Sequence, residues 1–422
     1  MDKSDQNNKV NKQNSCMDDF DPDSLMVSDA LYNIYTAISP VSESEVVPIR
    51  ESLNRVLATD IVSSLNVPTA TNSAMDGYAL HGDTIPEQGT SKIKVVGTAF
   101  AGKPYQGEIG QGECIRIMTG AVMPDTTDTV IIQEHVERTG DEILIDSETK
   151  SGSNVRQAGE DIAAGDKVLK KGARIRAADI GVIASLGIGE IEVIRKIRVA
   201  FFSTGDELCS IGEELKNGNI YDSNRYTLFG MLSELNVTIM DMGVIKDNRE
   251  DLQQAFERAA TQADVIITTG GVSVGEADYV KEILQETGTV NFWKVAMKPG
   301  RPLAFGQIKD AHFFGLPGNP VSVMVTFSQF VKPALRHLMA ETETDTFSMQ
   351  VPCISELRKK PGRTEYQRGI LERDENNQWV VKKTGAQGSG ILRSMSQANC
   401  FIILPMDSSS IKPGAIVEVQ PF

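Results

Sequence analysis

A glycine-rich segment is the first place where the residue types of this sequence could bind a ligand. The stretch TTGGVSVGEADY (268–279) follows ADVIITT, a run typical of a buried strand, and precedes a helical pattern. Gly270, Gly271 and Gly275 would let the backbone approach a ligand, and consecutive amides at a helix start attract an anion. The spacing is neither a Walker A motif nor G-x-G-x-x-G, so a structural turn is the alternative. The position after a strand favours a ligand site, because ligands of open α/β sheets bind at the carboxyl ends of strands.

Acidic residues follow the same predicted strand and its neighbours. Asp206 and Glu207 lie in STGDEL, Asp247 follows VTIMDMG, and Asp278 lies just past the glycines. Magnesium typically takes one or two carboxylates together with waters and substrate oxygens. Each acid alone could be a helix cap. Two or three of them in one crevice would instead form a magnesium site.

The otherwise apolar segment WKVAMKPGRP (293–302) contains three cationic residues, Lys294, Lys298 and Arg301. A hydrogen bond to a charged group contributes about 1.5–3 kcal/mol, so three of them could hold a tetrahedral oxyanion. The alternative is three solvated side chains.

Polar residues also lie beside glycines in three turn-like segments. TNSAMDGYA (71–79) contains Asp76, IRIMTG ends on Thr119 and Gly120, and AGED contains Asp161. Asp76 could orient a polar ligand, or it could form an Asx turn with its own backbone.

The elements that would position these residues form an alternating pattern between Arg198 and Leu338. RVAFFSTG, VTIMDMG and ADVIITT are typical of strands, and they alternate with amphipathic helical patterns. This order predicts a mostly parallel α/β sheet. GLPGNPVS (315–322) then leads into an apolar helix with Asn319 as the N-cap and Pro320 at its first position. The amides at this helix start could bind an anion or serve only to begin the helix.

Shorter patterns surround the α/β sheet. Residues 91–147 and 349–422 contain short β-branched runs, which predict two small β modules. We expect helices near 22–38, over Ile49–Ala58, and over 176–187. The expected organisation is a disordered tail (1–24), a split domain (25–62 and 155–196), an inserted β domain (63–154), an α/β domain (197–340) and a C-terminal β domain (348–422).

The composition limits the class of partner. The 422 residues contain 42 Lys and Arg against 57 Asp and Glu, which gives a net charge of −15. This balance argues against nucleic acid or an anionic membrane as the main partner, although a local basic pocket could still bind a small anion. The scattered cysteines predict reduced thiols in the cytoplasm, and the histidines lack zinc-site spacing. The sequence contains no apolar run that predicts a membrane span or a signal peptide.

Taken together, the motifs resemble one family. TNSAMDGYA, AFAGKPYQGE, IRIMTGAVMPD, GEDI, FSTGDEL, IYDSNR, TTGGVSVGEADY, FWKVAMKPGRP and GLPGNPVS occur in the order found in molybdopterin molybdenumtransferases. The E domain of gephyrin is similar. The resemblance runs from about residue 25 to residue 422 and implies multidomain α/β plus β architecture. An elongated split domain with an inserted β domain would precede a molybdopterin-binding α/β domain and a C-terminal β barrel.

The resemblance also implies a reaction. Adenylylated molybdopterin and molybdate are the substrates, AMP leaves, and molybdenum is placed on the dithiolene sulfurs with the help of Mg²⁺. Family members are homodimers, with the active site between the α/β domain of one subunit and the split-domain region of the other. Molybdopterin adenylyltransferase and apo-molybdoenzymes are possible further partners.

By motif, the resemblance assigns roles to residues of this sequence. The catalytic positions are Asp76, Thr119, Asp161, Glu207, Asp247 and Asp278. The metal ligands are Glu207 and Asp278. The substrate-binding positions are Gly270, Gly271, Ser273, Gly275, Lys294, Lys298, Arg301, Pro317, Pro320, Arg368 and Ser389, the last two being looser matches.

Two other functions make different demands on the sequence. A molybdopterin adenylyltransferase should lack TNSAMDGYA and both β modules. A receptor-clustering scaffold, the second role of a gephyrin E domain, would be expected to carry a fused partner domain. We therefore expect the transferase.

Overall fold

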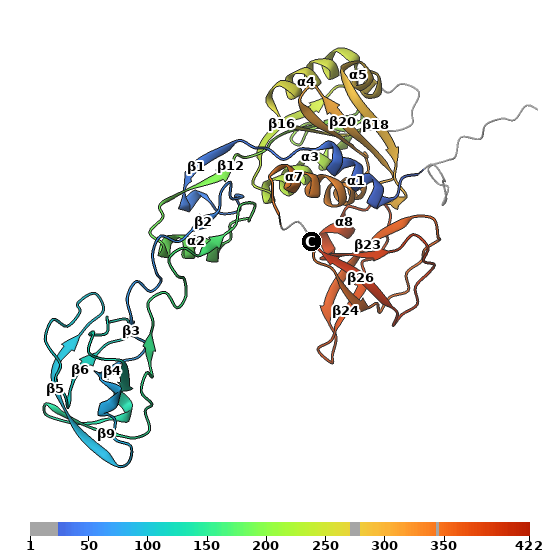
Figure 1. Ribbon diagram of the computed structural model, residues 1–422. Helices are drawn as coiled ribbons and strands as arrows, with labels where there is room; N and C mark the ends of the chain where they lie inside the picture. The colour runs from blue at the N-terminus through green and yellow to red at the C-terminus, as the bar shows by residue number, and fades with distance from the viewer. Residues whose placement is uncertain (1–23, 271–278, 343–345) are drawn as a thin grey trace, which may run out of the picture. The chain divides into compact units, whose positions relative to one another are not determined.

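The computed structural model describes residues 24–270, 279–342 and 346–422, and the chain forms two compact units (Figure 1). Among the described residues, the large unit contains the chain from Ser24 to Glu45, the short piece Asn54–Val56, and the part from Ile194 onward. The small unit contains Val46–Leu53 and Leu57–Val193.

A six-stranded sheet forms the centre of the α/β part of the large unit, in the order β16-β13-β17-β21-β20-β18. Its strands are β13 (Arg198–Thr204), β16 (Thr238–Ile245), β17 (Val265–Thr269), β18 (Gly288–Lys294), β20 (Pro302–Ile308) and β21 (Ala311–Leu316). β16, β13, β17 and β21 run parallel, whereas β20 and β18 are antiparallel to their neighbours. The four parallel strands end at one edge, so the loops that follow them lie side by side.

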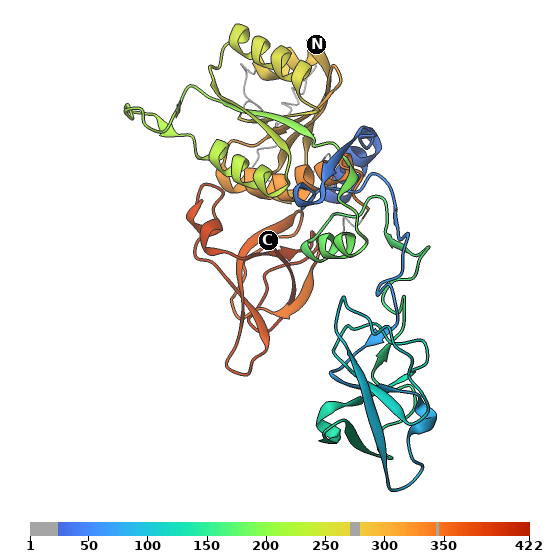
Figure 2. The ribbon, with the colours of Figure 1, turned by 90° about the vertical axis from the view of Figure 1, so that its left-hand side faces the viewer.

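Helices cover both faces of this sheet. They are α3 (Ser223–Glu234), α4 (Arg249–Gln262), α5 (Tyr279–Thr287), α6 (Pro320–Thr326) and α7 (Lys332–Leu338), with a π-helical turn, η4 (Phe327–Val331), between the last two. Helices α4 and α5 lie on one face, and α3, α6 and α7 lie on the other (Figure 1 and Figure 2). Phe256 of α4 packs edge-on against Phe202 and Phe313 of the sheet, with ring centroids 5.2 and 5.8 Å away. Helix α1 (Val27–Ala37) packs beside α7.

The C-terminal part of the large unit is a second, antiparallel sheet. It contains β22 (Met349–Pro352), β23 (Thr364–Arg373), β24 (Trp379–Lys383), β25 (Cys400–Leu404) and β26 (Ile416–Pro421), with α8 (Arg393–Gln397) beside it. The sheet curls, because Cys353 after β22 bridges Val381 of β24 around a buried aliphatic core. A short strand from the α/β part, β19 (Met297–Lys298), joins the edge of this sheet by pairing with β23. The two parts of the large unit are therefore connected by backbone hydrogen bonds.

The small unit contains a six-stranded sheet in the order β7-β4-β6-β5-β9-β8. The strands are β4 (Gly77–Leu80), β5 (Thr90–Ala99), β6 (Glu113–Ile117), β7 (Thr129–Ile132), β8 (Glu137–Thr139) and β9 (Glu142–Asp146). Two short antiparallel strand pairs connect the segment before this sheet to the segment after it. β2 (Ile61–Val62) pairs with β11 (Lys167–Leu169), and β3 (Asn72–Ser73) pairs with β10 (Val155–Arg156). Helix α2 (Ala177–Ser185) follows, as the sequence predicts.

The prediction of a helix over Ile49–Ala58 is wrong. Only a 3₁₀ turn, η1 (Ile49–Glu51), forms. Asn54 has a left-handed φ of 61°, which ends right-handed helical geometry. Leu57 then bridges Val193 of the strand β12 (Glu190–Ile194), which also pairs with β1 (Ser44–Pro48). Pairing with a distant strand outweighs the local apolar periodicity here.

The predicted fold class, multidomain α/β plus β, is confirmed. Among the described residues, no helix combines the length and apolar character needed to cross a membrane.

Candidate functional site

The glycine-rich loop begins at the shared carboxyl edge of the parallel strands. Gly270 follows β17 with a φ of 86°, and a Cβ atom there would lie 2.4 Å from the Thr204 carbonyl oxygen. Its amide donates to the Leu316 carbonyl at 3.3 Å, so the loop starts between the ends of β13 and β21. Gly271, Ser273, Gly275 and Asp278 lie outside the described residues.

We expect Gly270→Ala to lower the free energy of unfolding by about 1–3 kcal/mol, because alanine is strained at this φ and its Cβ would clash with Thr204. Urea denaturation measures the effect. Gly230→Ala is the matched control, since Gly230 lies on α3 with no atom within 4 Å of a built Cβ. That change should stabilise the helix by about 0.5–1 kcal/mol. A Gly270→Ala variant as stable as the wild type would contradict the argument.

Acidic side chains gather at the same edge. Asp206 and Glu207 are exposed in the turn after β13, and Asp247 is half-buried in the loop after the adjacent strand β16. Burial raises the pKa of Asp247, and the charges of Asp206 and Glu207 raise it further. A divalent cation would relieve this repulsion, and an all-oxygen donor set suits Mg²⁺. Across the described ranges, no three His, Cys, Asp or Glu side chains are close enough to hold a metal by themselves.

The cations of WKVAMKPGRP lie in different surroundings. Arg301 is only 7% exposed, so the alternative of three solvated side chains is wrong for this residue. Lys294 is exposed at the end of β18. The Lys298 ammonium lies 3.1 Å from a carboxylate oxygen of Glu365, which the sequence analysis did not identify. The segment therefore connects the α/β part to the C-terminal sheet.

A pocket of about 440 Å³ lies where Lys298 and Pro299 meet the C-terminal sheet. Its charged lining residues are Lys298, Arg358, Arg368, Lys383, Glu356 and Glu365, which makes cations the majority. Tertiary structure thus brings Lys298 and Arg368, both predicted as substrate-binding, to one positively charged pocket. The surplus positive charge suits an anionic ligand.

Arg368 is 1% exposed, and burial lowers its pKa to about 10. Its Nε donates to the Ser394 hydroxyl and a terminal nitrogen donates to the Gly388 carbonyl, each at 3.0 Å. These contacts hold the loop that contains Ser389 against β23. A guanidinium fixed in this way is preorganised to meet an anion.

The start of α6 is tied to the same loop. The Val321 amide donates to the Ser389 carbonyl at 3.1 Å, and Asn224 donates to the Gly318 carbonyl at 2.7 Å. Asn319 and Pro320 occupy the N-cap and first positions as predicted, and Pro317 is buried. Because Ser389 takes the Val321 amide, that amide is not open to a ligand.

The small unit holds the remaining predicted residues. Asp76 accepts hydrogen bonds from both the amide and the hydroxyl of Thr119, each at 2.7 Å. These bonds, with the charge of Arg116, lower the pKa of Asp76 and keep it ionised. The carboxylate therefore bonds to a residue 43 positions away rather than to its own turn. Asp161 is exposed in a separate turn, where its own backbone amide donates to the Val67 carbonyl at 3.1 Å.

Glu365 and Gln367 are two residues of the positively charged pocket that no motif in the sequence indicates. Both are buried in β23, with Gln367 donating to Glu365 at 3.0 Å. The available signal was their alternation in TEYQRGILE, which places two polar side chains on the same face of one strand.

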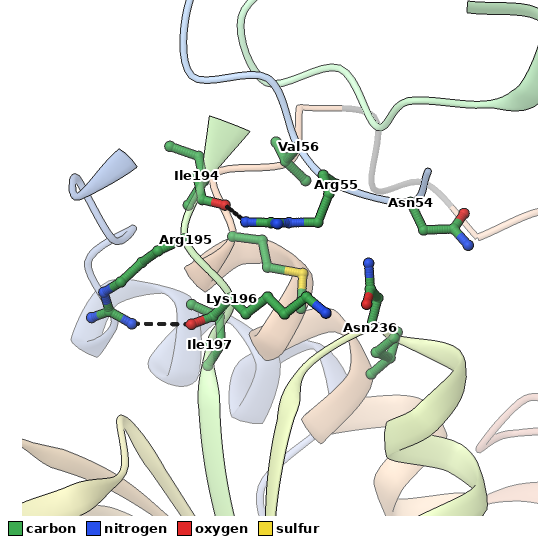
Figure 3. A pocket seen from close by; sticks show the side chains of 10 residues that line it. Asn54, Arg55, Val56, Ile194, Arg195, Lys196, Ile197 and Asn236 are labelled. Carbon is green, nitrogen blue, oxygen red and sulfur yellow. Dashed lines mark hydrogen bonds between the residues drawn. The ribbon is translucent and has the colours of Figure 1, made fainter. Parts of the chain in front are cut away.

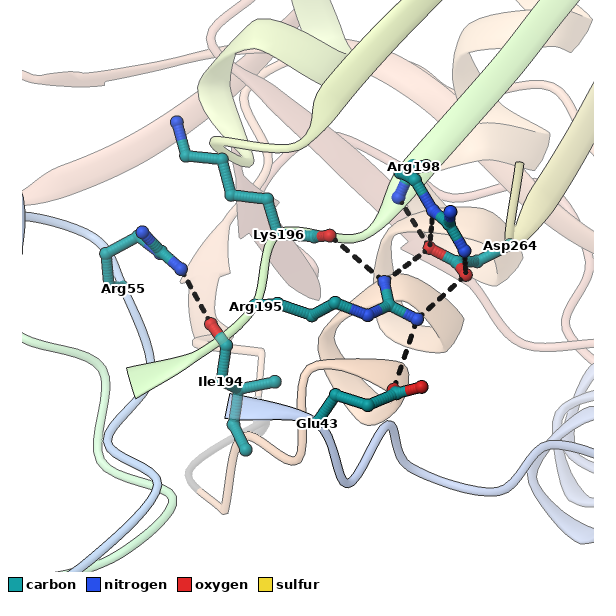
Figure 4. Close-up of polar contacts among 7 residues, drawn as sticks. All are labelled: Glu43, Arg55, Ile194, Arg195, Lys196, Arg198 and Asp264. Atoms are coloured by element: carbon teal, nitrogen blue, oxygen red, sulfur yellow. Dashed lines mark hydrogen bonds and ion pairs between the residues drawn. The ribbon is translucent and has the colours of Figure 1, made fainter. Parts of the chain in front are cut away.

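A second cavity, lined in part by Arg55, Lys196 and Asn236, lies near the amino end of β13 (Figure 3). Its volume is about 10 Å³, which has room for one water at most. Beside it, Asp264 receives hydrogen bonds from Arg195 and Arg198, each at 2.8 Å, and Arg195 also pairs with Glu43 (Figure 4). We interpret this cluster as structural rather than catalytic.

We expect Asp264→Asn to lower the free energy of unfolding by about 2 kcal/mol at neutral pH. Burial alone would raise the pKa of Asp264, but the two arginines lower it from 3.8 to about 2. A depressed pKa stabilises the fold fully above 3.8, and this contribution is lost as the pH falls towards 2. Urea midpoints of variant and wild type should therefore converge with acidification. Asp310→Asn is the control, because Asp310 is exposed in the turn between β20 and β21. If the difference in urea midpoint between Asp264→Asn and the wild type does not shrink in acid, the stabilising role of the ion pairs is contradicted.

Three protein-family models match successive parts of the chain. The model described as "MoeA N-terminal region (domain I and II)" matches residues 25–187. "Probable molybdopterin binding domain" matches residues 200–337, and "MoeA C-terminal region (domain IV)" matches residues 350–422.

Relatives and solved structures agree with these models. A molybdopterin molybdenumtransferase of Haemophilus influenzae is 42% identical over 90% of this chain and 94% of its own length. Gephyrin of Dictyostelium discoideum is 34% identical over 89% of this chain and 59% of its own length. A crystal structure titled molybdopterin biosynthesis moeA protein, from Pyrococcus horikoshii OT3, has a TM-score of 0.83 at 28% identity, covering 94% of this chain and all of that one. With the motifs in order and these matches along nearly its whole length, the chain belongs to the molybdopterin molybdenumtransferase family.

Proposed function

We propose that this chain inserts molybdenum from molybdate into adenylylated molybdopterin and releases AMP. Family membership supports a transferase of molybdenum cofactor biosynthesis. The observation that carries the finer proposal is the carboxyl edge of the parallel strands. Gly270 opens the glycine-rich loop there, beside the carboxylates of Glu207 and Asp247.

The acids at this edge have a defined task in the proposed reaction. Cleavage of a phosphoanhydride concentrates negative charge, and Mg²⁺ would supply the compensating positive charge. Glu207 and Asp247 would hold the ion, together with Asp278, which we predict from the sequence as a further ligand. The raised pKa of Asp247 supports this placement, because burial and then the charges of Asp206 and Glu207 oppose its ionisation, and a bound cation would offset both.

The positive pocket would receive the oxyanion. Lys298 and Arg368 offer charged N–H donors from two different parts of the large unit. Burial of Arg368 and its two hydrogen bonds fix the direction of one donor. The resemblance supports Lys294, Arg301, Pro317, Pro320 and Ser389 as further substrate-binding residues. It supports Asp76, Thr119 and Asp161 of the small unit as catalytic residues.

The direct test is incubation of the full chain with purified adenylylated molybdopterin, molybdate and Mg²⁺, followed by chromatography of AMP. We expect AMP release that depends on molybdate and stops with a chelator. Incubation with molybdopterin and ATP is the companion assay. Adenylylation in that assay without AMP-releasing insertion in the first would assign the adenylyltransferase reaction instead.

We also propose a cytoplasmic homodimer, which the resemblance supports. Size-exclusion chromatography with light scattering should give about twice the chain mass of 45.9 kDa at micromolar concentration. A mass near that of one chain would count against the dimer. Transfer partners would be the adenylyltransferase and apo-molybdoenzymes.

A further inference from the structure

Glu365 is a buried carboxylate held from two sides. The residue is 5% exposed, and one carboxylate oxygen lies 3.1 Å from the Lys298 ammonium. The other oxygen accepts from the side-chain amide of Gln367 at 3.0 Å, and Gln367 is itself 6% exposed. The Lys298 side chain is 50% exposed. Glu365 is therefore the fixed member of the ion pair and Lys298 the movable one.

Backbone pairing sets this contact. β19 runs parallel to β23, with Lys298 opposite Glu365 and Met297 opposite Thr364. The Thr364 amide also donates to the Ala296 carbonyl at 2.9 Å, which extends the pairing by one bond. Side chains directly opposite on neighbouring strands interact, so this register gives Lys298 a carboxylate partner from the C-terminal sheet.

Both residues also line the pocket of about 440 Å³. In the absence of a ligand, Glu365 satisfies the charge of Lys298. An anion that uses Lys298 must compete with Glu365 for the charge of the ammonium, because Gln367 and burial keep the carboxylate in place.

We propose that Glu365 is the resident counter-anion of Lys298, with which an incoming tetrahedral oxyanion must compete, so that Glu365 lowers the affinity of the pocket and favours release. This inference rests on the proposed function, which assigns Lys298 to the oxyanion.

Glu365 opposes binding rather than assisting it, because the side-chain hydrogen bonds to its two oxygens come from Lys298 and from the neutral amide of Gln367. Lys359 is close enough to interact electrostatically with Glu365. Its ammonium, however, donates to three backbone carbonyls, those of Lys360, Met406 and Ser408. An ammonium has three donors, so Lys359 keeps these bonds; it attenuates the charge of Glu365 without taking the place of Lys298 in a direct ion pair. When Lys298 turns to a ligand, a buried negative charge remains beside the pocket and repels the anion.

The test is calorimetric titration of the full chain with sodium molybdate at constant ionic strength. Glu365→Gln keeps the side-chain shape and an oxygen acceptor for Lys298 but removes the charge. We expect it to bind molybdate about tenfold more tightly than the wild type, the order expected from one nearby charge at partial burial. Glu356→Gln removes the same charge from the same pocket, from an exposed position. That control should change affinity less than about threefold, because exposed charges are screened.

Glu365→Asp supplies a second, milder variant if Glu365→Gln does not fold. The shorter carboxylate draws back from Lys298 by one methylene, so molybdate should bind with an affinity between those of the wild type and Glu365→Gln. Unchanged or weaker binding in the folded Glu365 variants would overturn the proposal. Equal tightening in Glu356→Gln would overturn it as well, since general pocket charge would then explain the result.

Failure of the proposed function is distinguishable from failure of the inference about Glu365, because the two are read in different measurements. It would appear as absence of AMP release by the wild type, whereas the affinity ranking of the variants is read without turnover.

Discussion

Replacement of Lys298 by alanine should weaken the use of molybdate about 10- to 100-fold, because one charge-assisted contact contributes about 1.5–3 kcal/mol. Lys298→Arg should show an intermediate defect, since arginine keeps the charge but replaces a compact ammonium with a planar fork. The measurement is AMP release against molybdate concentration, with adenylylated molybdopterin and Mg²⁺ held constant. Thermal melting should fall for Lys298→Ala, because the buried Glu365 carboxylate then loses its ammonium partner, and should fall less for Lys298→Arg, which keeps a cation there.

Lys383→Ala is the matched control for this variant. Lys383 lines the same pocket from an exposed position, and its ammonium donates to the Glu356 carbonyl at 2.8 Å. Lys383→Ala should weaken the use of molybdate less than Lys298→Ala does. If saturating molybdate fails to restore Lys298→Ala, and the pterin substrate binds less tightly instead, Lys298 belongs to the pterin phosphate subsite.

Replacement of Glu207 by glutamine should reduce AMP release about 100-fold at limiting Mg²⁺, with partial recovery as Mg²⁺ is raised. The reason is that metal assistance contributes several kcal/mol to charge stabilisation, and the amide is a weaker ligand than the carboxylate. The same change should lower the pKa of Asp247 towards its ordinary value, since the charge of Glu207 is one of the causes that raise it. Steady-state rates across a Mg²⁺ series and carboxylate NMR provide the two measurements.

Glu214→Gln is the control for Glu207→Gln, because Glu214 is an exposed acid seven positions further along the same segment between β13 and α3. It should leave the Mg²⁺ dependence unchanged. A rate for Glu207→Gln equal to that of the wild type throughout the Mg²⁺ series would show that Glu207 only completes the turn after β13.

Local sequence patterns were sufficient for the central fold. RVAFFST forms β13, and the VIITT of ADVIITT forms β17. The apolar residues Leu228, Leu232 and Leu235 are buried on and after α3. Pro320 begins α6 as predicted. These features depend on neighbours within one or two turns, where periodicity and backbone preference decide the outcome. The same reasoning failed for Ile49–Ala58, where pairing of Leu57 with Val193 replaced a helix.

Local sequence was enough to predict the alternation of strands and helices in the α/β part, the glycine at the strand end, and the motifs that identify the family. Tertiary structure alone decided the partners of the charged groups. Lys298 meets Glu365 across 67 positions because β19 pairs with β23 in one register, and Asp76 meets Thr119 across 43 positions because β4 lies beside β6. Periodicity shows which face a side chain occupies. Which side chain lies opposite depends on the register between distant strands, and that register is set by the packing of the whole sheet.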